Sequence, residues 1–312
     1  MMVGHAMVAF ALATAAASRR WSPQRALSFG VVAAAFATVP DVDMAYAGVG
    51  LAQAGVGGVW ELTSAFWGSS TLVHRAVTHS LVVGAVAAVA FAATASDRAR
   101  VAAVPLGAAL VGAAFVESGP LGAAIMGLFV LAGVGVAVVA AGTTDLGPRE
   151  LLVAALVGLL SHPFGDVLTG EPPGFFYPFD LLAFDSRVVL LGDPTLNLLA
   201  VFGVELATIW VAGYVYLRAN DERLLAHVDA RAAVGAAYAI AALALPAPTM
   251  EVSYHFVFSI LSVGIVGVAP QLHPSRSVLS AEWDETITWV LTGLGAVSIA
   301  ALAYTGVYAF AA

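Results

Sequence analysis

The chain has 312 residues, of which 61% are hydrophobic and 10% are charged, so polar side chains are too few to cover a water-soluble surface. All 12 basic residues are arginines, the formal net charge is −8, and there is no cysteine, which excludes disulfides and thiolate metal ligands. We therefore predict an all-α, polytopic transmembrane bundle in the inner (cytoplasmic) membrane. Its expected partner is the lipid bilayer, and we expect no nucleic-acid partner.

Apolar runs separated by charged or Pro/Gly stretches predict about ten membrane spans. In chain order they cover residues 2–17, 24–39, 77–95, 101–116, 121–141, 150–168, 195–217, 231–246, 253–270 and 286–311. No positive charge precedes the first run, so we expect it to be retained rather than cleaved as a signal peptide. Residues 1–200 are expected to form the functional region, and residues 201–312 to add further helices of the same domain.

The arginines predict the orientation of these spans. All but two of the 12 fall in alternate connections, the exceptions being Arg75 and Arg187. Since cytoplasmic connections are enriched in basic residues, both termini are predicted to be extracytoplasmic. On that topology His5 and three polar stretches, PDVD at 40–43, HRAVTH at 74–79 and SHPFGD at 161–166, all lie at the outer face. Their coincidence indicates a shared site.

The third stretch gives the most local argument for such a site. His162 and Asp166 are four residues apart on a predicted helix, so both side chains project from one face and could bind one ion. Ionisable groups at membrane depth are costly to bury and are retained where they line a polar cavity. Pro163 is expected to kink the span.

In PDVD, Asp41 and Asp43 are two residues apart and point into one space only if the chain is extended there. Pro40 favours this, because it disfavours helical geometry in the residue before it. Two carboxylates that close together are unfavourable unless a cation or a proton lies between them. A metal ion is therefore expected beside them.

In HRAVTH, a helix is expected to begin near Val77 or Thr78, with His79 in its first turn. His74 and Arg75 would then lie in the preceding loop, where the guanidinium is free to bind an anionic group. Farther along the chain, Asp193 precedes Pro194 and is expected to cap the next helix.

Together these stretches supply one set of candidate metal ligands at the outer face. The predicted ligands are His5, Asp41, Asp43, His74, His79, His162 and Asp166. Imidazole and carboxylate ligands suit a divalent metal, with zinc expected and manganese or iron as alternatives, and the set is large enough for two ions. Each stretch alone also has a structural explanation, such as an interfacial histidine or a helix exit.

The order of these residues resembles the LexA-binding, inner membrane-associated hydrolase family, also called membrane-bound metal-dependent hydrolases. The resemblance rests on His5, on PDVD, on His74-Arg75 followed by Thr78-His79-Ser80, and on His162-Pro163 with Asp166; it extends through FFYPFD and GDPTLN to about residue 200. Ala76 stands where that family usually has glycine. A more distant similarity to zinc-dependent phospholipase C implies a phosphoester substrate.

We therefore predict a phosphoesterase-like, metal-dependent hydrolase that acts on a phosphoester or lipid-linked substrate at the outer membrane face. Water activated by the metal would attack the substrate, with Arg75, Asp43 and His79 in catalytic roles. The alternative is a transporter or channel for protons or metal ions that uses the same His/Asp cluster. A scaffold with a structural metal is a third interpretation.

Overall fold

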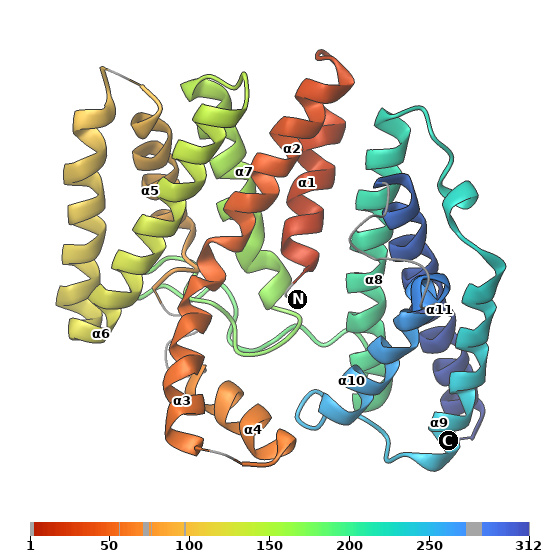
Figure 1. Ribbon diagram of the computed structural model, residues 1–312. Helices are drawn as coiled ribbons and strands as arrows, with labels where there is room; N and C mark the ends of the chain where they lie inside the picture. The colour runs from red at the N-terminus through yellow and green to blue at the C-terminus, as the bar shows by residue number, and fades with distance from the viewer. Residues whose placement is uncertain are drawn as a thin grey trace. The chain divides into compact units, whose positions relative to one another are not determined.

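The computed structural model describes residues 3–55, 57–70, 75, 77–96, 98–272 and 283–311, and every regular element within these ranges is a helix. Contacts divide the chain into two compact units, Met1–Val188 and Val189–Ala312 (Figure 1). The residues predicted to form the site belong to the first unit.

Within the described residues, the first unit contains seven α-helices and one 3₁₀ helix. They are α1 (Gly4–Ala17), α2 (Pro23–Thr38), η1 (Pro40–Tyr46, 3₁₀), α3 (Ala47–Ala54), α4 (Val59–Ser70), α5 (Leu81–Thr94), α6 (Arg100–Thr143) and α7 (Pro148–Asp166). Helix α6 is bent into two arms, which Figure 1 shows joined at one end and inclined to each other. The arms meet at Gly119, whose φ of 68° together with Pro120 interrupts the helix.

Small residues bring the helices of this unit close together. A side chain at position 158 of α7 would collide with the backbone carbonyl of Ala33 in α2, and one at Gly133 of α6 would collide with the ring of Phe91 in α5. Glycine at these positions therefore allows the close helix approach that is typical of membrane bundles. The core around these contacts is rich in alanine, with valine, phenylalanine and leucine.

The second unit is built around two long helices. Its elements are α8 (Pro194–Ala219), η2 (Leu224–His227, 3₁₀), η3 (Ala230–Ile240, 3₁₀), α9 (Ala241–Ala244), α10 (Tyr254–Ser262), η4 (Val263–Leu272, 3₁₀) and α11 (Trp283–Ala311). Buried Ile260 and Tyr304 lie in its core. Asp193 accepts a hydrogen bond from the Leu196 N–H and Pro194 begins α8, which confirms the predicted cap.

The prediction of about ten spans is wrong for the part of the chain described. Three helices are long and apolar enough to cross a membrane, namely α6, α8 and α11, and a fourth span is formed if α2 and η1–α3 count as one span bent by 41°. Helices α1 and α5 have 14 residues each, fewer than the ~20 that a perpendicular crossing needs. The runs at 101–116 and 121–141 are the two arms of α6, and those at 231–246 and 253–270 are divided between 3₁₀ and short α-helices.

Candidate metal centre

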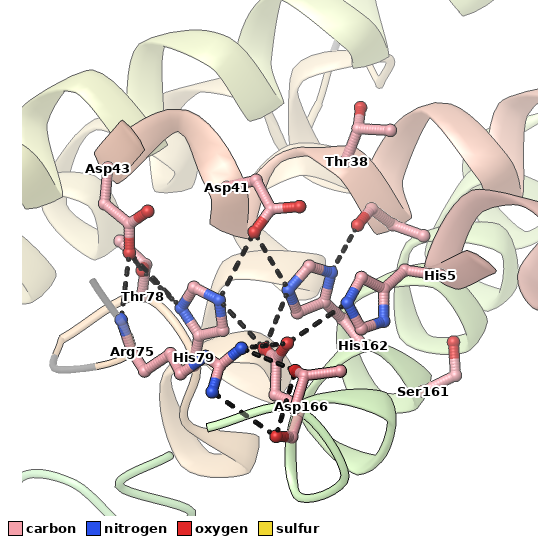
Figure 2. A network of polar contacts seen from close by, with 12 residues as sticks. His5, Thr38, Asp41, Asp43, Arg75, Thr78, His79, Ser161, His162 and Asp166 are labelled. Atoms are coloured by element: carbon pink, nitrogen blue, oxygen red, sulfur yellow. Dashed lines mark hydrogen bonds and ion pairs between the residues drawn. The ribbon is translucent and has the colours of Figure 1, made fainter. Parts of the chain in front are cut away.

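Four helices of the first unit have one end at the same place, and those ends carry the predicted site residues. His5 lies in the first turn of α1, Asp41 lies on η1 directly after α2, and His79 lies just before α5. His162 and Asp166 lie in the last turns of α7. Figure 2 shows these side chains pointing toward one another.

The orientation of His162 follows from the packing of α7 against α2. Gly158 approaches the carbonyl of Ala33, and one helical turn farther along both helices the Nδ1 atom of His162 lies 2.6 Å from the carbonyl oxygen of Ala37. Because a carbonyl oxygen can only accept a hydrogen bond, Nδ1 carries the proton. The lone pair of Nε2 therefore faces the centre.

His79 is oriented in the same way by side chains rather than by backbone. The Thr78 hydroxyl donates to Asp43 Oδ2 over 2.9 Å and lies 2.8 Å from His79 Nδ1. Since the hydroxyl gives its only proton to the carboxylate, it accepts from Nδ1–H. Nε2 of His79 is therefore left as the ligand atom, as in the carboxylate–histidine arrangements that support metal ligands.

Four atoms converge at this point: Asp41 Oδ1, His79 Nε2, His162 Nε2 and Asp166 Oδ2. Asp41 Oδ1 lies 3.6 Å from His79 Nε2 and 3.4 Å from His162 Nε2, and Asp166 Oδ2 lies 3.3 Å and 3.4 Å from the same two nitrogens. Among the described residues, His162 Nε2 and Asp166 Oδ2 are buried and have no hydrogen bond. Buried polar atoms are normally satisfied, so this geometry calls for a further group between them.

The spacing and charge of the four atoms fit a metal ion. Ligand bonds of ~2.0–2.1 Å in a tetrahedral zinc site place neighbouring ligand atoms ~3.3 Å apart, close to the four imidazole–carboxylate distances given above. Burial by itself would lower the pKa of the His79 imidazole, but the neighbouring carboxylates of Asp166, Asp41 and Asp43 raise it to about 9. The surroundings of Nε2 therefore favour positive charge.

The prediction that the chain is extended at Asp41 and Asp43 is wrong, because Pro40 begins a 3₁₀ helix instead of an extended segment. The two carboxylates consequently lie on opposite sides of the His79 imidazole. Asp41 faces Nε2 of His79, whereas Asp43 Oδ2 lies 3.4 Å from Nδ1 and accepts from the Arg75 N–H. Asp43 thus lies behind His79 and supplies none of the four converging atoms.

The predicted start of the helix at Val77 or Thr78 is also wrong. Helix α5 begins at Leu81, and Ser80 is its N-cap, accepting from the N–H groups of Val82 and Val83. His79 is therefore a loop residue. The sequence signal for this cap was the serine directly after the histidine, a residue type strongly preferred at that position.

Arg75 was expected to be free for an anionic group, and the structure contradicts this. Its guanidinium lies 3.1 Å from Asp166 Oδ1 and donates to Thr169 Oγ1 over 2.7 Å and to the Glu171 carbonyl over 3.2 Å. Its backbone adopts a positive φ of 68°. Thr169, which was not among the predicted site residues, fixes this guanidinium. His74, predicted as a metal ligand, lies outside the described residues.

His5 lies beside His162 and contacts the carboxylate oxygen of Asp166 that is not among the four converging atoms. Its Nε2 is 3.2 Å from Asp166 Oδ1, and its ring stacks on His162 with centroids 3.9 Å apart. His5, His162 and Asp166 form a second group with metal-ligand spacing. There, however, Asp166 Oδ1 already faces the positive charge of Arg75.

Comparison with known proteins places this centre within a matched region. The family model described as YdjM inner membrane protein matches residues 1–250, a range that includes all the residues of the centre. No curated protein and no solved structure matches the chain.

Proposed function

This chain belongs to the YdjM inner membrane protein family, and from that premise we propose that it is a membrane-bound, metal-dependent hydrolase. The metal would be held by Asp41, His79, His162 and Asp166. The observation that carries the proposal is the pair of buried atoms, His162 Nε2 and Asp166 Oδ2, that face the other two ligand atoms without a hydrogen bond among the described residues. Two imidazoles and two carboxylates suit zinc, with manganese or iron as alternatives.

A bound metal of this kind supplies a Lewis acid and an activated water. The protein leaves one ligand accessible for that chemistry, because the Asp41 side chain is 23% exposed whereas those of His79, His162 and Asp166 are at most 2% exposed. The substrate would therefore approach from the Asp41 side. Thr78 and Asp43 hold the His79 ring in place, and Arg75, which contacts Asp166 Oδ1 and donates to Thr169, would hold the Asp166 carboxylate in place.

The surroundings of Asp166 favour one metal ion over two. A second ion between His5 and Asp166 Oδ1 would lie next to the guanidinium of Arg75, whose Nη2 is 3.1 Å from the same oxygen. Like charges that close repel each other strongly in a buried site. We therefore assign His5 to the support of Asp166 rather than to the metal.

The position of the centre favours a substrate presented by the membrane. Arg19, Arg98 and Arg149 lie at the ends of the first unit's helices that are opposite the centre, so we propose that the centre faces the extracytoplasmic side. A phosphoester of a lipid or of a lipid-linked molecule is then the expected substrate.

The polar residues favour a hydrolase over a transporter. Among the described residues of the first unit, Thr14 is the only buried polar side chain that lies away from the centre. The core between the helices is otherwise apolar, so it offers no continuing series of polar groups for an ion to follow. A cluster confined to one end of the helices is the arrangement expected of a reaction centre.

The test combines elemental analysis with hydrolysis by the full chain in phosphatidylcholine nanodiscs. We expect about one zinc, manganese or iron ion per chain, the number that one four-ligand site holds. We also expect hydrolysis of p-nitrophenyl phosphate or of a short-chain phospholipid, and His162→Ala should lose both properties. A wild-type protein with no more metal than His162→Ala would overturn the metal centre, and stoichiometric metal without hydrolysis of either substrate would overturn the enzymatic role.

A further inference from the structure

The loop that follows the metal ligands, residues 167–188, presents a run of exposed apolar side chains. Every residue from 179 to 186 is exposed, and the run includes Phe179, Leu181, Leu182 and Phe184. The Leu182 side chain alone is 78% exposed. Contiguous exposed apolar patches of this kind mark contacts with a partner or a membrane.

This loop is held in a defined position beside the metal centre. At its base the Val188 N–H donates to the Val167 carbonyl over 2.7 Å. The carbonyl of buried Phe175 accepts from the Leu81 N–H over 2.8 Å, and the Tyr177 carbonyl accepts from the Ser80 hydroxyl over 2.8 Å. Ser80 and Leu81 directly follow His79, so the loop is attached to the segment that carries a proposed metal ligand.

The apolar surface of the loop continues the outer surface of a helix. Phe164, in the last turns of α7, is exposed, and its ring lies 5.3 Å from that of Phe175. The Phe175 ring in turn lies 5.5 Å from that of Phe184. A continuous line of aromatic side chains therefore connects α7 to the exposed part of the loop.

The lengths of the helices place this loop at membrane depth. Helices α1, α2, α5 and α7, which end at the centre, have 14, 16, 14 and 19 residues. At ~1.5 Å per residue they extend ~21–28 Å, less than the ~30 Å of the hydrocarbon core. Arginines lie at their opposite ends, as at Arg19, Arg98 and Arg149, and mark that end as one interface. The helix ends that carry the metal centre therefore do not extend beyond the membrane interface on the opposite side from the arginines.

From these observations we propose that residues 179–184 contact the lipid of the leaflet nearest the metal centre, so that the partner of this surface is the bilayer itself. Irregular backbone is excluded from the hydrocarbon core, so the loop occupies the interface between acyl chains and headgroups. Asp180 and Asp185 flank the apolar side chains, which favours zwitterionic over anionic headgroups. If the protein is the hydrolase proposed above, an amphiphilic substrate enters the centre from the leaflet rather than from water. This substrate route rests on the proposed function.

The absence of cysteine from the sequence makes the inference directly testable. A nitroxide spin label is attached to L182C in phosphatidylcholine nanodiscs, and its collisions with oxygen and with a water-soluble nickel chelate are compared. Two similarly exposed positions serve as references: L131C on α6, 70% exposed, for lipid, and L225C on η2, 79% exposed, for water. We expect the ratio of oxygen to nickel collisions at position 182 to match that at 131 and to exceed that at 225 several-fold.

Either of two results would overturn the inference. If the label at 182 collides with the nickel chelate as often as the label at 225, it lies in water. If it collides with neither oxygen nor the chelate, it is covered by protein. L181C repeats the measurement if L182C does not fold. The readout needs no metal and no activity, so it can fail while the hydrolase proposal stands, and it can succeed in the His162→Ala variant.

Discussion

The chain holds two clusters of similar chemical groups, one in each unit, and they differ in what their imidazole nitrogens already contact. In the second unit, Glu222, His227 and Asp284 also have metal-ligand spacing. There, His227 Nε2 lies 2.7 Å from Glu222 Oε2, and Nδ1 lies 3.0 Å from the Thr288 hydroxyl. Both nitrogens of this histidine thus have a protein partner, and the Asp284 side chain is largely exposed.

The first unit uses the same groups differently. His79 and His162 each give Nδ1 to a protein acceptor, and each directs Nε2 toward two carboxylates. The difference teaches that a metal site is recognised less by the number of its potential ligands than by buried atoms without a hydrogen bond, which among the described residues of this centre are His162 Nε2 and Asp166 Oδ2. The predictions below set the first cluster against the second, which serves as an internal control.

Removing the metal should have the largest effect and should act on one unit. A ligand present at ~1,000 times its dissociation constant stabilises the folded state by ~4 kcal/mol. Chelation should therefore increase hydrogen exchange of the amides in α1, α5 and α7, which meet at the centre, and leave α8 and α11 unchanged. Mass spectrometry of the nanodisc-embedded protein with and without the chelator measures this. Equal changes in both units, or none, would contradict a metal confined to the first.

Asp166→Asn should cause the next largest effect, because it removes a buried ligand while keeping the shape of the side chain. Loss of a direct ligand should weaken zinc binding more than ~100-fold, since supporting residues alone account for 10–100-fold. The matched variant is Asp284→Asn in the second cluster, which should bind zinc like the wild type. Competition with a fluorescent chelator gives both affinities. Weaker binding in Asp284→Asn would mean that the exposed cluster holds the metal.

Thr78→Val should weaken zinc binding ~10–100-fold, because the hydroxyl that accepts from His79 Nδ1–H is lost while the shape is retained. Thr288→Val makes the same change beside His227 and should leave zinc affinity unchanged. The pair distinguishes a supporting role at the metal from a general effect of removing a hydroxyl beside a histidine. If the two variants behave alike, the proposed role of Thr78 is wrong.

The features of this centre that depend only on neighbouring residues could be predicted from the sequence. Those that depend on contacts with distant parts of the chain could not. The HxxxD spacing of His162 and Asp166 lies within one helix, and the Asp193 cap needs only its neighbours, so both were predictable. The direction of Asp43 was not, since it depends on a 3₁₀ turn that Thr78 and the Arg75 backbone stabilise from another part of the chain.

The engagement of Arg75 and the number of spans were also beyond the local sequence. The partners of its guanidinium, Thr169 and the Glu171 carbonyl, come from a loop more than 90 residues away along the chain. Hydropathy identifies apolar runs, but it does not distinguish a crossing helix from a 14-residue helix such as α1 or α5 that ends at a buried polar centre.

His5→Phe should have the smallest effect of all, and it decides whether the centre holds one ion or two. Phenylalanine retains the ring that stacks on His162 but cannot contact Asp166 Oδ1. If His5 only supports Asp166, zinc stoichiometry stays the same and affinity falls less than ~10-fold, the lower end of the range for supporting residues. If His5 binds a second ion beside Asp166, the variant instead loses one of two ions. Elemental analysis of wild type and His5→Phe distinguishes these results. We expect one ion in both proteins, because Arg75 Nη2 lies 3.1 Å from Asp166 Oδ1 and its positive charge should exclude a second ion there.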